Sequence, residues 1–464
     1  MEGQRDKGRA KSTFKGGDEP TWGVPDRQEI SALKDQFEGY QTTSVQGVPI
    51  VLLYDDQPAD ATVLREGHSG WGVLPKTPFY IEAGGQVSDS GWIRGPHGEA
   101  IVDGLRRIPG RRDFPRAHHV RITKGELRAR DIVTAEVDDA ARDATRRNHT
   151  ATHLLHAALR QVLGAHVKQA GSLVAPDRFR FDFVHFQPVT RDELDRIERI
   201  VNEQICRNTP VQTEERSTEE AIAAGAMALF GEKYGDKVRV VSVHGFSMEL
   251  CGGTHVSATG DIGFFAITAE SGVSAGVRRI EAVTGAGAVQ WAQLQRAALK
   301  GLVDALRVNE DQAVDAIERL QTDAKRLARE VAQLKTKLAM SGGGPAEADD
   351  TVDLGGVKLA RRKVSDFDKD ALRGLVDSLK AKLKSGVVVV ASAKEGKVQF
   401  VVAVTPDLTG RIKAGQIVKE IAPIVGGSGG GRPDFAEAGG KQPDKIDEML
   451  KAAESVVAKL LGRT

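Results

Sequence analysis

Hydrophobic positions recur with different spacings along the chain, and each spacing predicts a different kind of element. Between residues 46 and 137, short apolar runs such as VPIVLLY, GWGVLP and DIVTAEV are separated by turn-forming residues. Short, closely spaced strands of this kind are typical of a small antiparallel barrel. We therefore predict a β-barrel domain over residues 35–137. The polar residues 1–34 before it resemble a tail or the remnant of a preceding domain.

The next segment mixes helical and strand patterns. Apolar residues recur at helical spacing over residues 148–163 and 192–207, whereas FRFDFVHF, VRVVSV and IGFFAI indicate strands. This combination predicts an α+β domain over residues 138–287. Cys206, near the end of the second helical pattern, is expected to be a core or half-buried residue.

Residues 288–340 are almost wholly helical in pattern. Apolar residues over 317–338 alternate intervals of three and four, which is a heptad seam. A break is expected near Glu310, because Asn309 and Gln312 offer a capping pair there. The pattern predicts a helical hairpin or a coiled-coil arm. The seam does not distinguish packing within one chain from dimerisation.

A glycine-rich linker and another domain follow. The linker, residues 341–352, begins SGGGPAEADD, and the strand patterns GVVVVASA and VQFVVAVT come after it. Helical patterns alternate with these strands and end in a helix over residues 444–461. We predict a small α/β domain over residues 353–464, so that the chain as a whole is of the α+β class.

Composition limits the partners and the compartment. Lys and Arg number 65 and Asp and Glu 64, so any affinity for nucleic acid must come from local clusters. The chain has only two cysteines, and its first residues, MEGQRDKGRAK, lack the apolar core of a signal peptide. No apolar run approaches the ~20 residues that span a bilayer. We expect a cytoplasmic protein without a membrane partner.

Two matched motifs carry the most specific chemical signal. His149 and His153 lie in HTATH, and Cys251 and His255 have the same spacing in CGGTH. Residues four apart on a helix share a face, so the first two imidazoles can reach one metal. The HxxxH motif alone is more often a pair of packed helical histidines. With CxxxH added, the set matches a tetrahedral site, and we predict one Zn²⁺ per chain.

Several segments together resemble alanyl-tRNA synthetases. They are TPFYIEAGGQVSDSG (77–91), RNHTATHLLHAALRQVLGAHVKQAGSLV (147–174), CGGTH, GVSAGVRRIEAVTG (272–285) and GGSGGGRPDFAEAGG (426–440). The resemblance runs from about residue 35 to the end and covers the family's editing domain and C-terminal domain, in order. The HxxxH and CxxxH pair is also similar to free-standing alanyl editing proteins and to the editing domain of threonyl-tRNA synthetases. The last segment is similar, more loosely, to the DHH phosphoesterase-associated domain.

The resemblance implies an aminoacyl-tRNA deacylase that hydrolyses seryl or glycyl esters on tRNA(Ala). The family's class II aminoacylation core has no room ahead of the predicted barrel, so we expect no adenylate formation and a separate aminoacylation half as a partner. Ser88 and Glu437 depart from the family pattern, which usually has glycine and glutamine there. The alternative function is a non-catalytic, zinc-stabilised tRNA-binding or dimerisation module.

The resemblance also implies roles for residues near the metal. Thr152 and Gln169 match positions that contact the substrate, and the Thr152 hydroxyl would pair with a serine hydroxyl. A threonine hydroxyl bonded to its own helix backbone is the alternative. Thr150 stands where HExxH zinc proteases carry glutamate, so a peptidase would lack its general base. Four protein ligands favour a structural or electrostatic zinc over one that activates water.

Two regions are expected to contact tRNA. Arg278 and Arg279 could face phosphates or pair internally with Glu281, and we favour RNA for one of them. The glycine-rich segment with Gly429, Gly430 and Arg432 could approach an RNA backbone closely, with a flexible loop between strand and helix as the alternative. The partners that follow are tRNA(Ala), mischarged aminoacyl-tRNA, and a second copy of the chain through the helical arm or the C-terminal domain.

Overall fold

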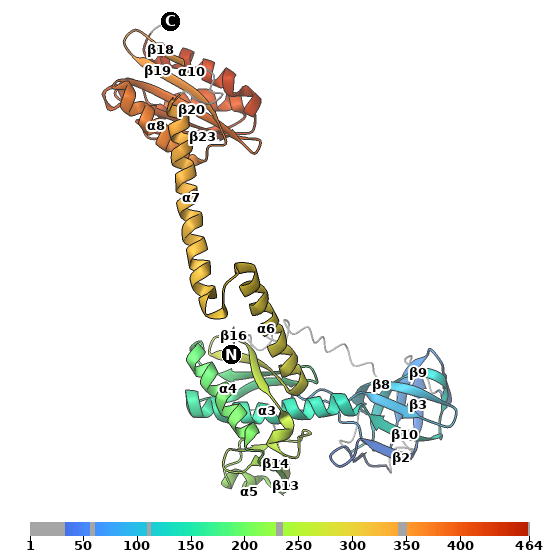
Figure 1. The fold of residues 1–464 in the computed structure, drawn as a ribbon. Helices are drawn as coiled ribbons and strands as arrows, with labels where there is room; N and C mark the ends of the chain where they lie inside the picture. The colour runs from blue at the N-terminus through green and yellow to red at the C-terminus, as the bar shows by residue number, and fades with distance from the viewer. Residues whose placement is uncertain (1–32, 56–60, 109–112, 229–234, 342–349, 463–464) are drawn as a thin grey trace. The chain divides into compact units, whose positions relative to one another are not determined.

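The computed structural model describes residues 33–55, 61–108, 113–228, 235–341 and 350–462. The predicted tail therefore lies almost wholly outside the described residues, as does most of the predicted linker. The chain forms two compact units, Met1–Ala298 and Leu299–Thr464, and their boundary falls within helix α6 (Gly285–Leu306) (Figure 1). The finer domain boundaries remain predictions.

The first unit begins with a curled antiparallel sheet of eight strands, in the order β2-β10-β7-β8-β9-β5-β3, with β4 paired to β9. The strands are β2 (Ser44–Pro49), β3 (Leu52–Asp55), β4 (Val63–Arg65), β5 (Ser69–Val73), β7 (Gly91–Arg94), β8 (Gly98–Arg107), β9 (Arg116–Arg128) and β10 (Ile132–Val137). A short parallel pair, β1 (Gln36–Phe37) and β6 (Lys76–Thr77), lies outside this sheet. Val48, Phe79 and Val120 are buried in the core of the curled sheet.

The sheet is antiparallel, as predicted. Among the described residues, however, no hydrogen-bonded strand pair joins its two edges to close a barrel. Strands β2 and β3 form the two edges of the sheet, and they are successive parts of one segment. At the bend between them, the Ile50 N–H donates to the Asp131 carbonyl and the Val51 N–H donates to the Val73 carbonyl. The two edges therefore meet through a chain corner, and the sheet is better described as a strongly curled half-barrel.

A long helix and a second sheet form the next layer, which confirms the predicted mixture of helices and strands. Helices α3 (Asp139–Leu163) and α4 (Arg191–Cys206) pack with a sheet in the order β11-β12-β17-β16. Its strands are β11 (Gln169–Val174), β12 (Phe179–Val184), β16 (Phe265–Ser274) and β17 (Val277–Thr284). Helix α3 begins at Asp139, nine residues before the predicted start. Asp138 caps this end of the helix, because its carboxylate accepts a hydrogen bond from the Ala141 N–H.

A smaller antiparallel sheet, β13-β14-β15, carries the second ligand motif at its end. It consists of β13 (Val211–Ser217), β14 (Lys237–Val243) and β15 (Ser247–Leu250), with the short helix α5 (Thr218–Ala223) beside it. The prediction for Cys206 was wrong, because this residue is exposed. Helix α4 buries Ile197, Val201 and Ile205, and the position after Ile205 turns away from that face.

The helical segment has the predicted break. Helix α6 ends at Leu306, and α7 (Ala313–Ser341) begins after a 3₁₀ turn that Asn309 and Gln312 cap. The apolar seam of α7 is exposed to solvent, with Ile317 at 40% and Leu334 at 63% of full exposure. This apolar seam is therefore available for packing against another helix.

The C-terminal part of the second unit has helices on both faces of a six-stranded sheet, in the order β18-β19-β20-β21-β23-β22 (Figure 1). The strands are β18 (Asp350–Asp353), β19 (Lys358–Ser365), β20 (Gly386–Lys394), β21 (Lys397–Val404), β22 (Ser428–Gly431) and β23 (Phe435–Gly440). Along β20, Val387 and Val389 face α9 (Ala414–Ile421) and α10 (Ile446–Leu460), whereas Val388 and Val390 face α8 (Lys369–Leu383). This alternation buries both faces of the sheet against helices.

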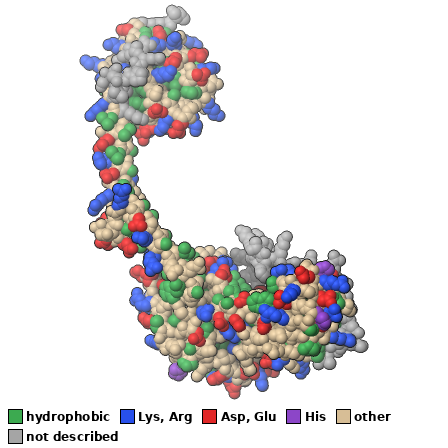
Figure 2. Space-filling model, turned by 45° about the vertical axis from the view of Figure 1, so that its right-hand side comes forward, with side chains coloured by type: hydrophobic (Ala, Val, Ile, Leu, Met, Phe, Trp, Pro, Cys, Tyr) green, Lys and Arg blue, Asp and Glu red, His purple; other side chains and the backbone are tan. Residues whose placement is uncertain are grey.

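On the face drawn in Figure 2, Lys and Arg side chains are interspersed with Asp and Glu over both units. Among the described residues, no helix is long and apolar enough to cross a membrane.

Candidate metal centre

The structure brings the four predicted ligands together. Helix α3 supplies His149 and His153 one turn apart, and the loop after β15 supplies Cys251 and His255. Their ligand atoms all lie within 4.8 Å of one another. The Cys251 Sγ lies 3.4 Å from His149 Nε2 and 3.3 Å from His255 Nε2. Tetrahedral Zn–N and Zn–S bonds place donor atoms roughly 3.5 Å apart, so the donor types and the two distances from Cys251 match a zinc site.

Two of the ligands already have the ionisation that suits a cation, whereas at His153 burial is outweighed by the Glu249 and Cys251 charges, which raise the pKa to about 9, so a metal would have to displace that proton. Burial alone would raise the pKa of the Cys251 thiol, but the neighbouring imidazoles, His149 first, outweigh burial and hold that pKa well below its usual range. Burial lowers the pKa of His255 to about 3, so this imidazole is neutral at pH 7. A thiolate and a neutral imidazole are the forms that bind a divalent metal.

Hydrogen bonds behind two imidazoles fix which ring nitrogen faces the cluster. The His149 Nδ1–H donates to the Gln86 Oε1 over 2.7 Å, which leaves Nε2 for a metal. The His255 Nδ1 lies 3.1 Å from the Thr150 Oγ1, whose own proton goes to the Arg146 carbonyl. Thr150 can therefore only accept from His255. Sequence reasoning treated Thr150 as a missing glutamate and gave it no role of its own.

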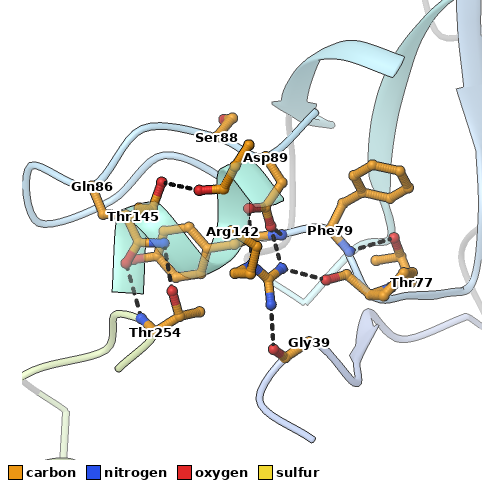
Figure 3. Close-up of polar contacts among 12 residues, drawn as sticks. Gly39, Thr77, Phe79, Gln86, Ser88, Asp89, Arg142, Thr145 and Thr254 are labelled. Carbon is orange, nitrogen blue, oxygen red and sulfur yellow. Dashed lines mark hydrogen bonds and ion pairs between the residues drawn. The ribbon is translucent and has the colours of Figure 1, made fainter. Parts of the chain in front are cut away.

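Gln86 is a functional residue that sequence reasoning missed. It is fully buried and comes from the loop between β6 and β7. Its Nε2 donates to the Thr254 Oγ1, and its Oε1 accepts from the Thr254 N–H, both at 2.9 Å (Figure 3). One amide thus connects a ligand on α3 with the loop that carries the other ligand pair. A side chain at Gly253 would overlap the His149 ring, so this position requires glycine.

A buried ion pair holds the Gln86 loop on helix α3. Arg142 is fully buried and donates to Asp89 in the loop, with a distance of 2.9 Å between Nε and Oδ1. It also donates to the carbonyls of Gly39 at 2.6 Å and Pro78 at 2.8 Å (Figure 3). The buried Arg142 guanidinium therefore finds its counter-ion and its hydrogen-bond acceptors inside the protein, as a buried charge requires. The loop position is therefore fixed by the first turns of α3.

A second group of contacts holds the CGGTH backbone. The Tyr40 hydroxyl donates to the Gly252 carbonyl at 2.6 Å, and the Arg239 guanidinium lies 4.1 Å from the centre of the Tyr40 ring. Arg239 also donates to the carbonyls of Cys251 and Gly253. Arg239 thus bonds to backbone on both sides of the sharp turn that presents the thiolate.

A pocket of about 180 Å³ opens beside the cluster. It is lined by Tyr80, Ala83, Gly84, His149, Thr152, His153, Gln169, Ser172, Glu249, Leu250, Cys251, Gly252 and Gly253. Pockets for drug-sized ligands usually begin at about 300 Å³, so this one suits a group of a few atoms, such as an amino acid.

Both predicted substrate-contacting residues line this pocket. The Thr152 hydroxyl donates to the Asn148 carbonyl at 2.8 Å, so it can only accept a hydrogen bond from another group. The local backbone bond considered from the sequence is therefore present. The Gln169 Nε2 donates to the Ser172 Oγ at 3.0 Å.

Both arginines expected near RNA are paired inside the protein. Arg278 makes two hydrogen bonds of 2.6 Å to Glu270, and Arg279 makes bonds of 2.7 and 2.9 Å to Asp182. Neither of these bonds involves Glu281, the partner considered from the sequence. An RNA contact by one of them remains a prediction, and it would have to compete with these ion pairs.

The glycine-rich segment forms an edge strand, so the alternative of a flexible loop is wrong. Strand β22 pairs with β23, and a side chain at Gly429 would overlap Ala438. That glycine is explained by strand pairing, whereas Gly430 has open space around it. Gly430, Arg432 and Arg373 line one groove. Within it, Glu437 forms ion pairs with both Arg373 and Lys369.

Three parts of the chain match known protein families. Three family models match: "tRNA synthetases class II (A)" over residues 1–141, "Threonyl and Alanyl tRNA synthetase second additional domain" over 238–281, and "DHHA1 domain" over 356–459. The alanine--tRNA ligase of Halorhodospira halophila is 46% identical over 458 residues, which are 98% of this chain and 51% of the relative. That of Solibacter usitatus is 45% identical over 453 residues, 97% of this chain and 51% of the relative.

The chain thus spans about half the length of the curated relatives it matches. Among solved structures, the C-Ala domain from Aquifex aeolicus alanyl-tRNA synthetase is 31% identical and covers 24% of this chain and 98% of that domain. Its TM-score is 0.23, which is too low to bear on the fold.

Proposed function

Because the chain belongs to the alanyl-tRNA synthetase family, we propose that it hydrolyses seryl and glycyl esters from mischarged tRNA(Ala). The observation that supports this most directly is the pocket of about 180 Å³ beside the ligand cluster, with Thr152 and Gln169 in its wall. A pocket of this size accepts an aminoacyl group and leaves the attached nucleotide outside. The reaction class is therefore ester hydrolysis at the end of an RNA.

A zinc ion held by His149, His153, Cys251 and His255 would supply positive charge at one side of the pocket. The four protein ligands favour a role in positioning and electrostatics over one in generating hydroxide. An aminoacyl ester is already activated, so the chain's own residues need to hold it and place a water molecule. We assign this positioning to the Gln169 amide, which Ser172 orients through their hydrogen bond.

Selectivity for serine is assigned to Thr152. Since its proton is held by the Asn148 carbonyl, its hydroxyl can only accept a hydrogen bond from a group in the pocket that Thr152 lines. A serine hydroxyl can donate to it, whereas alanine leaves it unpaired. Buried polar groups left unpaired cost about 1–3 kcal/mol, which sets the discrimination that one such group supplies.

The second unit and the remaining surfaces are proposed to bind tRNA. We assign contacts to Gly430 and Arg432 in the groove beside α8, and to one of Arg278 and Arg279 after it leaves its acidic partner. The exposed seam of α7 supports a proposed homodimer. A cytoplasmic location completes the proposal.

A non-catalytic tRNA-binding module is the competing function, and ester loss separates the two. Zinc-loaded protein is incubated with seryl-tRNA(Ala), glycyl-tRNA(Ala) and alanyl-tRNA(Ala), and the intact ester is followed with time. We expect faster loss of the seryl and glycyl esters than of the alanyl ester. If all three esters decay at the rate seen without protein, the non-catalytic module is the correct function.

A further inference from the structure

Three aromatic or imidazole rings gather at one end of the β11-β12-β17-β16 sheet. His166 precedes β11 and is exposed, while His185 and Phe186 follow β12. The Val184 N–H donates to the Lys168 carbonyl at 2.9 Å, which holds the two segments side by side. Phe186 is 80% exposed, the largest exposed fraction among the described large hydrophobic residues.

The His166 ring is held in a defined position. It lies edge to edge with the His185 ring and nearly in its plane, with ring centroids 5.3 Å apart, an interplanar angle of 22°, and a hydrogen bond of 3.0 Å between His166 Nε2 and His185 Nδ1. Arg160 donates to the carbonyls of Ala165 and Val167, each at 2.9 Å, so the backbone on both sides of His166 is anchored. Gly164 has a φ of +117°, and a Cβ there would lie 3.1 Å from the His166 ring.

The Phe186 ring also packs directly against a glycine. Gly276 has a φ of +76° in the turn between β16 and β17, and a Cβ there would lie 3.0 Å from the Phe186 ring. The His185 N–H donates to the Gly276 carbonyl at 3.0 Å, which ties this turn to the segment that carries Phe186. An exposed ring supported by backbone in this way loses little conformational freedom when another flat group stacks on it.

The charges around the rings suit a phosphodiester. Lys168 is exposed between His166 and the start of β11. The nearby carboxylates are already engaged, since Glu270 binds Arg278 and Glu193 accepts from the Thr190 N–H and hydroxyl. A cation beside exposed rings is the arrangement by which proteins bind single-stranded nucleic acid without reading its sequence.

The ring cluster also lies close to the pocket. Gln169, in the pocket wall, pairs with Phe183 across the strands, and His185 is two residues beyond Phe183. Two residues of a strand span about 7 Å. An ester whose acyl group occupies the pocket would therefore have its nucleotides within reach of the rings.

We infer that His166, His185 and Phe186, with Lys168, form a stacking platform for the unpaired nucleotides at the 3′ end of the RNA. The identity of the RNA end rests on the proposed function, whereas binding of unpaired nucleotides can be measured without it. The platform holds the acceptor strand outside the pocket while the ester lies inside. Stacking reads no base, so any sequence in this strand is accepted.

The test uses the full chain and an uncharged RNA hairpin with an unpaired 3′ end, whose terminal base is 2-aminopurine. Stacking on a ring quenches this fluorophore, so one titration gives both the Kd and the quench. We expect Phe186→Ala and His166→Ala each to raise the Kd about fivefold or more and to reduce the quench. Phe186→Trp keeps a stacking ring and should retain wild-type binding.

Phe264→Ala is the matched control, because Phe264 is 41% exposed and lies at the other end of the same sheet. Zinc content and melting temperature establish that each variant is folded. Unchanged Kd and quench in both Phe186→Ala and His166→Ala would overturn the inference. Ring-dependent binding by a protein that hydrolyses no ester would support the platform and overturn the proposed function.

Discussion

Gln86 accepts a hydrogen bond from His149 over 2.7 Å and thereby links the loop after β6 to the ligand cluster. The same side chain bonds to the backbone and hydroxyl of Thr254, next to His255. Gln86 thus orients a ligand from α3 and positions the loop that carries Cys251. Through this residue, the loop after β6 contributes to the same site as α3 and the loop after β15.

Replacing Gln86 should weaken zinc binding without removing a ligand. Gln86→Leu leaves the His149 Nδ1–H and the Thr254 N–H without their acceptor, so we expect zinc affinity to fall about 10–100-fold. Competition with a chromophoric chelator measures this affinity. Gln187→Leu, at an exposed position, is the control. Wild-type zinc affinity in Gln86→Leu would mean that the Gln86 contacts are structural only.

The two cysteines provide a matched pair for testing the ligand set. Cys251→Ala removes the anionic ligand, and we expect less than one zinc per chain after purification without chelators. Cys206→Ala removes an exposed cysteine on α4 and should keep the full zinc content. Elemental analysis of both variants and of the wild type decides the matter. Equal zinc in all three proteins would exclude Cys251 as a ligand.

Thr152 should control selectivity without affecting the metal. Thr152→Val removes the hydroxyl oxygen that accepts a hydrogen bond from a serine side chain. An alanine side chain leaves the same oxygen without a donor. We expect the ratio of single-turnover hydrolysis rates, seryl over alanyl ester, to fall about fivefold or more. Thr150→Val is the comparison, because Thr150 contacts His255 and its loss should reduce zinc affinity. An unchanged ratio in zinc-loaded Thr152→Val would remove its hydroxyl from the selectivity mechanism.

The ligand cluster was predictable because each half of it is local. The spacing of His149 and His153 places both on one helix face, and Gly252 with Gly253 permits the turn that presents Cys251. Gln86 is 63 residues from His149, and their contact depends on how the loop packs against α3. No periodicity in the sequence reports such a contact.

Other features were missed because the sequence signals were misleading. The first turns of α3 have a polar sequence, so the spacing of apolar residues could not indicate a helix there. Arg142 in this stretch is nevertheless fully buried, where it pairs with Asp89. Glycine runs usually weaken strands, yet Gly429 allows β22 to approach Ala438 of β23. In both places, tertiary contacts stabilise a structure that the local sequence alone does not favour.

His118 should make the curled sheet sensitive to acid. It is fully buried; its Nε2 accepts from the Thr77 hydroxyl at 2.8 Å and its Nδ1–H donates to the Gly72 carbonyl at 3.2 Å. Burial, together with the Arg116 charge, lowers its pKa to about 3, whereas an unfolded chain has a histidine pKa of about 6.5. Below pH 6.5 the unfolded state therefore binds more protons than the folded state, and stability falls as the pH approaches 3.

Because one pKa unit corresponds to about 1.4 kcal/mol, this histidine should cost about 2–3 kcal/mol of stability between pH 7 and pH 4.5. Urea unfolding of the wild type and of His118→Gln at both pH values isolates the effect, since acid loss of zinc is common to the two proteins. His118→Gln is less stable at pH 7, because glutamine does not reproduce both hydrogen bonds, but it should lose less stability on acidification. Equal losses in the two proteins would show that His118 takes up no proton on unfolding.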